Sequence, residues 1–184
     1  MIPLFAYIII IVRGERDGAE ELKGPLLGYM REKGVIFQQE GDGRMKGVSY
    51  SRLSLNPAHP SAVVCGQFDD PCWEVVTIAH EVGHILNFRE MGRDEAREFF
   101  CTVVVATFLG LEQLSWGGQR LMLYAEALAS LKGLEILKVI GIPDEGLADM
   151  RGMMVKLFKT YWCKCKRDVV DDVLKHSQVR ELVG

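Results

Sequence analysis

The sequence predicts an α+β fold, with a small N-terminal sheet followed by a mainly helical part. Short apolar segments separated by turn residues fill the first seventy positions, and long segments with helical spacing begin at Pro71. The chain has 184 residues, of which 48% are hydrophobic, and a net charge of -3, which suits one globular domain with a real core. We expect a single domain over 1–184. It would have a mixed part at 1–70, a helix pair at 71–110 and a helical lower part at 111–184.

The apolar opening run has to be distinguished from a membrane anchor or a secretion signal. It ends at Val12, well short of the ~20 residues that a membrane helix needs. It also lacks a basic region before it and a small-residue cleavage site after it. We therefore expect a buried strand at 5–12, no membrane partner and a cytoplasmic protein.

The rest of the first part reads as one helix and short strands. A polar helix is expected at 17–33, ending at Gly34, followed by a strand at 35–39. The turn residues at 40–44 predict a hairpin in which 45–57 returns beside that strand. Residues 61–65 form another short strand, either an ordinary inner strand or a sheet edge that pairs with an extended substrate.

Helices are expected from Pro71 onwards. Asp69 or Asp70 can cap the first, which runs to about Arg89, with Gly92 as its left-handed end residue. A second follows at 94–110, a third at 119–140, and one or two more fill 144–184. The apolar segment LMLYAEALASL in the third helix reads either as a partner interface or as the floor beneath the site described below.

The cysteines and the overall charge exclude some classes of site. The chain has five cysteines, an odd number, and its sequence predicts no secretion signal, so we expect reduced thiols rather than disulfides. The pairs Cys65/Cys72 and Cys163/Cys165 lack the two-to-four-residue spacing of structural zinc sites. The basic stretch at 156–167 has acidic neighbours, so its aromatic residues are expected to face inward rather than bind nucleic acid.

The stretch AHEVGHILNF contains the pattern H-E-x-x-H. On a helix, His80 and His84 share a face, so both rings can reach one zinc ion at about 2.0–2.1 Å. Glu81 lies about 100° around the helix, where it can act as general base on a zinc-bound water. The alternative is that the two histidines have no ligand and simply lie on a buried core helix. It would bury three polar groups without a partner, which costs several kcal/mol, and a metal ion removes that cost.

A third ligand is needed, and the acidic residues of the next helix are the candidates. In a strictly antiparallel helix hairpin Glu98 would lie nearer to His84, whereas a crossing angle brings Glu95 closer. Hairpin geometry alone does not decide between Glu95 and Glu98 as the ligand. The glutamate that is not a ligand would be a solvated carboxylate near the start of the helix, where it favours the helix dipole. Gly83 adds a hint, since an interior glycine suits a place where another group approaches closely.

The segments HEVGHIL and DEAREFF resemble the gluzincins, zinc peptidases with a zincin-like fold, and most closely the ImmA/IrrE-type metallopeptidases. The resemblance covers about 56–109. It implies zinc held by His80, His84 and Glu95, with the glutamate before an alanine, and Glu81 as general base. It also implies a protein or peptide substrate, for example a transcriptional repressor.

Two other hypotheses stay open: a catalytically silent metal-binding or interaction module, and a non-peptidase zinc hydrolase such as a deformylase. The E-G-C-L context of deformylases is absent, which opposes the last one. An oxyanion donor is usual in peptide hydrolysis. The sequence does not single out one donor among its candidates, which are Tyr50, Tyr124, Tyr161 and His176.

Overall fold

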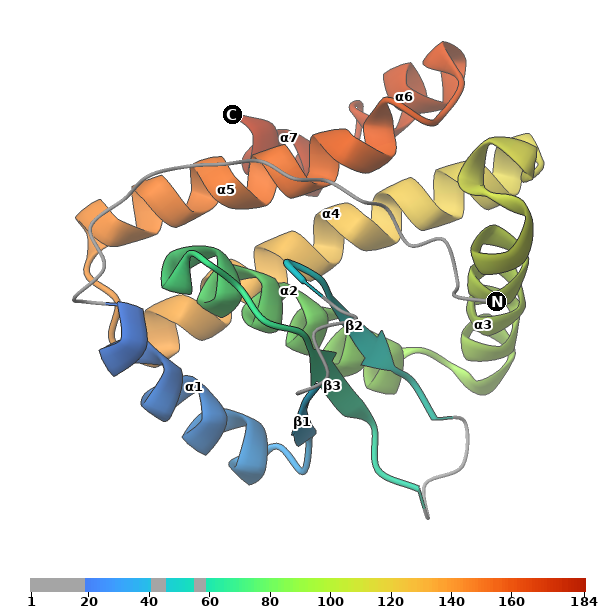
Figure 1. The fold of residues 1–184 in the computed structure, drawn as a ribbon. Coiled ribbons are helices and arrows are strands. Elements are labelled where there is room, and N and C mark those ends of the chain that lie inside the picture. Colours follow the sequence, from blue (N-terminus) through green and yellow to red (C-terminus); the bar gives the residue numbers. More distant parts are fainter. Residues whose placement is uncertain (1–18, 41–45, 55–58) are drawn as a thin grey trace.

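The computed structural model describes residues 19–40, 46–54 and 59–184, so the strand expected at 5–12 and most of the turn at 40–44 lie outside it. Over the described residues the chain combines a three-stranded sheet with a larger set of helices (Figure 1). The predicted α+β class is confirmed. In the part of the chain that is described, no helix has the length and apolar character needed to span a membrane.

The N-terminal part contains one helix and a mixed sheet. Helix α1 covers Ala19–Glu32 and is followed by Gly34, whose φ of 62° requires the left-handed region. The strands are β1 (Ile36–Gln39), β2 (Ser49–Arg52) and β3 (Ala62–Cys65).

The predicted hairpin between β1 and β2 is wrong. The sheet order is β1-β3-β2, with β3 parallel to β1 and antiparallel to β2. Strand β3 is apolar and buried along its whole length, which suits the centre, whereas β1 and β2 carry exposed polar residues, which suit the edges. Of the two interpretations of 61–65, the inner strand holds and the edge strand does not.

Helix α2 spans Pro71–Glu90 and lies between the sheet and the other helices. The Asp70 carboxylate caps it by accepting hydrogen bonds from the backbone N–H groups of Cys72 (2.8 Å) and Trp73 (3.4 Å). Gly92, predicted as a left-handed end residue, has a φ of -61° instead and directly precedes the next helix. The two helices therefore follow each other with almost no loop.

The remaining helices are α3 (Arg93–Leu109), the short 3-10 helix η1 (Leu111–Gln113), α4 (Trp116–Val139), α5 (Asp144–Trp162), α6 (Arg167–Val173) and α7 (Ser177–Val183). Three helices thus follow residue 144, where one or two were expected. In the basic stretch, Phe158 is fully buried and Trp162 and Tyr161 are partly buried, so these aromatic side chains do face inward.

The helices stack in layers on the sheet. The sheet covers one side of α2, α4 packs against the other side, and α5 packs on α4 and also contacts α2 (Figure 1). One buried cluster runs through α1, β3, α2, α4 and α5 to the C-terminal helices. Helix α3 stands at the edge of this stack, where Phe88, Ala96 and Phe99 form a smaller second cluster with the start of α4. The middle of α2 is therefore buried, with the sheet on one side and α4 on the other.

Candidate metal centre

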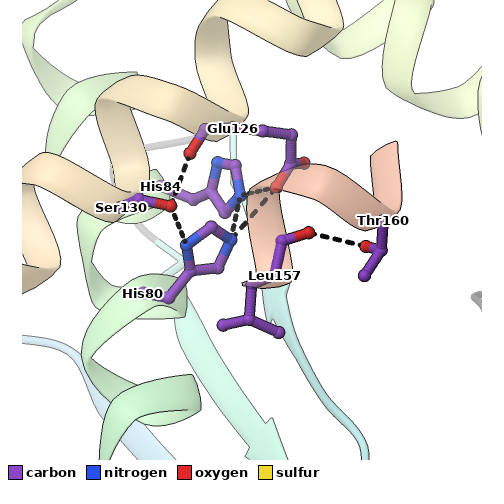
Figure 2. A network of polar contacts seen from close by, with 6 residues as sticks. All are labelled: His80, His84, Glu126, Ser130, Leu157 and Thr160. Atoms are coloured by element: carbon purple, nitrogen blue, oxygen red, sulfur yellow. Dashed lines mark hydrogen bonds and ion pairs between the residues drawn. The ribbon is translucent and has the colours of Figure 1, made fainter. Parts of the chain in front are cut away.

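Both histidines of the H-E-x-x-H motif point from α2 towards α4 (Figure 2). The side chains of His80 and His84 are 3% and 11% exposed, and their Nε2 atoms lie 3.1 Å apart. Their rings meet edge to face, with centroids 4.7 Å apart. The predicted sharing of one helix face is therefore confirmed, and the two ring nitrogens converge on one point.

A third candidate ligand atom comes from Glu126 in the middle of α4. Its Oε2 lies 3.1 Å from His80 Nε2 and 3.3 Å from His84 Nε2 (Figure 2). Within the described residues, these three side chains form a buried group able to hold a metal ion. Ligand atoms at 2.0–2.1 Å from a tetrahedral ion are separated by about 3.3 Å, so the triangle already has the size that such an ion requires.

The close approach of α2 and α4 depends on two glycines. A Cβ atom on Gly83 would lie 2.3 Å from the backbone carbonyl oxygen of Ala129. A Cβ on Gly133 would lie 3.2 Å from the backbone of Ala79 and His80. The close neighbour expected at Gly83 is therefore the backbone of α4. These two contacts bring α4 near enough for Glu126 to reach both histidines.

His80, His84 and Glu126, called the triad below, contain a buried charge pair between His84 and Glu126. Burial alone would lower the pKa of His84, but the charge and hydrogen bond of Glu126, with a contribution from Glu81, raise it to about 8. Burial would raise the pKa of Glu126, but the two histidines lower it to about 2. Without a metal, protonated His84 supplies the positive charge that balances the Glu126 carboxylate. A divalent ion bound between the three groups would supply that positive charge instead.

Glu81 lies on the neighbouring side of α2, facing the sheet edge rather than α4. It is 9% exposed, and burial raises its pKa, while the two histidines and a hydrogen bond with Ser51 of β2 oppose that rise. It is therefore close enough to interact with the triad without belonging to it. This is the position that the motif predicts for a base beside the ligands.

The structure does not bring Glu95 or Glu98 to the histidines, and this corrects the predicted third ligand. Ala96 and Phe99 form the buried face of α3. Glu95 and Glu98 each precede one of these residues, about 100° around the helix, and both are exposed. The two carboxylates are thus directed away from the core, and Glu126 occupies the position that was assigned to Glu95.

A sequence signal for Glu126 does exist. It is the only acidic residue in the apolar segment 121–131, and a lone carboxylate in a buried helix needs a cationic partner. It also precedes an alanine, as Glu95 does. One sequence interpretation placed this helix beneath the site, and the structure adds that the helix also supplies a candidate ligand.

Of the four candidate oxyanion donors, one lies close enough to the triad to interact with it and three do not. Burial, then the negative charges of Glu126 and Glu81, raise the pKa of Tyr161 on α5 well above its ordinary value, so this phenol lies near the triad and stays protonated. Tyr124 and His176 pack against each other on the α4–α7 side, with ring centroids 4.9 Å apart, and Tyr50 is exposed on β2. Tyr161 is therefore the one candidate donor coupled to the site.

All five cysteines are free, and none joins the metal-binding group over the described residues. Comparisons with protein-family models, with curated proteins and with solved structures found no match to this chain. Function must therefore be inferred from the chemistry of the site.

Proposed function

We propose that the protein is a zinc-dependent endopeptidase in which His80, His84 and Glu126 hold the ion and Glu81 is the general base. The observation that carries this proposal is the triangle of ligand atoms, with sides of 3.1, 3.1 and 3.3 Å, next to a separate buried carboxylate. The sequence resemblance to gluzincins and ImmA/IrrE-type peptidases supports it through the H-E-x-x-H motif. A zincin-like interpretation of the fold belongs to the same proposal.

The roles follow from the chemistry of the donor set. Two imidazoles and one carboxylate are a usual ligand set for catalytic zinc, which activates a water molecule and polarises a carbonyl group when bound. Glu81 would accept the proton of the attacking water and return it to the leaving amine. Its raised pKa suits this exchange, because a base must also be able to give the proton back. The protonated phenol of Tyr161, which interacts electrostatically with Glu126 and Glu81, is the proposed donor for an oxyanion.

The substrate we propose is a protein or peptide, with a regulatory protein such as a transcriptional repressor as an example. This part rests on the resemblance of the motif alone. The cytoplasm is the proposed compartment, supported by the five free thiols. Neither nucleic acid nor a membrane is part of the proposal.

A second candidate is a catalytically silent module that binds metal to stabilise its fold. The burial of the site favours this candidate, because the triad and Glu81 are all between 3% and 11% exposed. A peptide bond has to reach the ion for hydrolysis, so an active enzyme must open at this point. The silent module needs no such opening.

Glu81→Gln separates the two candidates. The zinc-loaded protein is incubated with unfolded casein, and cleavage is followed together with zinc content. If Glu81 is the base, cleavage should fall by about 10²–10⁴-fold while zinc stays at one ion per chain. The matched control is Glu90→Gln, at the exposed end of the same helix, which should change neither quantity. Zinc-loaded wild type that cleaves nothing while losing stability on zinc removal would favour the silent module.

A further inference from the structure

We infer that Ser130 is a positioning residue that keeps the proton of His80 on Nδ1 and so directs the lone pair of Nε2 at the metal. The inference rests on the proposed metal site, and does not require peptidase activity. Ser130 is fully buried on α4, one helical turn after Glu126. Its hydroxyl group contacts the backbone of one proposed ligand and the ring of another (Figure 2).

The direction of these hydrogen bonds follows from counting protons. Ser130 Oγ lies 2.9 Å from the backbone carbonyl oxygen of Glu126 and 3.2 Å from His80 Nδ1. The carbonyl can only accept, so it takes the single hydroxyl proton. Oγ then has only lone pairs left for the ring. His80 Nδ1 must therefore carry a proton and donate it to Ser130.

The consequence appears at the opposite side of the ring. A neutral imidazole has one N–H, so a proton on Nδ1 leaves Nε2 with a free lone pair. That atom lies 3.1 Å from Glu126 Oε2 and 3.1 Å from His84 Nε2, at the proposed ion position. Outer hydrogen bonds of this kind orient ligating histidines and raise metal affinity.

Ser130 also links the two helices that form the site. It donates to the backbone of α4 and accepts from a ring of α2, while Gly133, three residues further on, sits against the backbone of His80. No other described hydroxyl contacts either ring of the pair. We therefore expect removal of this one oxygen atom to weaken metal binding with little effect on the apolar core.

Nitrogen-15 NMR of the histidine side chains tests the tautomer in the wild-type protein itself. Spectra are recorded for the metal-free and the zinc-loaded chain. We expect a protonated Nδ1 on His80 in both, and a zinc-dependent shift at Nε2. In the zinc-loaded chain, an unprotonated Nδ1 on His80, or zinc on Nδ1, would overturn the role of Ser130. The absence of any zinc-dependent shift at His80 and His84 would instead overturn the proposed metal site.

Ser130→Ala tests the energetic effect. Zinc affinity, measured by competition with a chelator, should fall by about 10–100-fold, and Ser130→Thr, which restores the hydroxyl group, should recover part of it. The control is Thr102→Ala, since the Thr102 hydroxyl makes the same bond to a carbonyl four residues earlier on the exposed α3 without a ring partner. Its zinc affinity should stay at the wild-type value. An unchanged affinity in Ser130→Ala would contradict the inference.

Discussion

Helices α3 and α4 both follow the histidine helix, but they have opposite relations to it. Helix α4 packs against the middle of α2 with backbone contact at two glycines, and it buries one carboxylate between two histidines. Helix α3 stands at the edge of the molecule, and its acidic residues are exposed. Its last turn also leaves Phe108 79% and Leu109 62% exposed. The candidate ligand thus comes from the helix that approaches most closely, and not from the next one along the chain.

Gly83→Ala should disturb the close packing of α4 on α2 and cause the largest loss of stability among the substitutions proposed here. The new methyl group would lie 2.3 Å from a backbone oxygen of α4, which cannot rotate away, so the helices must separate. We expect a loss of about 1–3 kcal/mol in the free energy of unfolding, as in other overpacked cores. Urea denaturation of the metal-free protein measures it.

Gly152→Ala on α5 is the matched control for that experiment. A Cβ atom at this position would meet no atom of a neighbouring element within 4 Å, so the better helix propensity of alanine should raise stability by up to about 1 kcal/mol. Equal effects of the two substitutions would mean that the α2–α4 contact is not as close as described.

A smaller effect is expected from pH on the metal-free protein. The pKa of His84 is raised to about 8, so its contribution to stability is complete below its ordinary value of 6.5 and is lost as the pH rises through 8. The raised pKa of Glu81 also lowers stability as the pH rises above 4.5. The pKa of Glu126 is lowered to about 2, so its contribution is present above 4.5 and is lost as the pH falls through 2.

Urea denaturation between pH 3 and pH 9 measures this dependence. Stability should decline from about pH 6.5 to pH 8, and His84→Gln should remove that part of the decline. An identical pH profile in wild type and His84→Gln would contradict the proposed charge pair between His84 and Glu126.

The sequence predicted those features that depend on local pattern. The histidine face of α2 follows from i, i+4 spacing, an aspartate cap at position 69 or 70 from its place before Pro71, and a short strand at 61–65 from its apolar composition. These features need no knowledge of distant residues, and the structure confirms them.

The features that the sequence did not predict depend on tertiary packing. Strand β3 separates β1 from β2, a pairing that no turn signal encodes. Glu126 lies 42 residues beyond His84, and its approach depends on Gly83 and Gly133 facing the opposite helix. A glycine in each helix and a lone carboxylate in an apolar segment are visible in the sequence, but their convergence requires the helix packing.

The most direct test compares zinc binding by Glu126→Ala and Glu95→Ala, with zinc content and affinity measured on the purified chains and zinc located by anomalous scattering in crystals. Wild type and Glu95→Ala should each hold one ion between His80, His84 and Glu126, and Glu126→Ala should lose it. Retention of zinc by Glu126→Ala together with its loss from Glu95→Ala would contradict the metal centre described above.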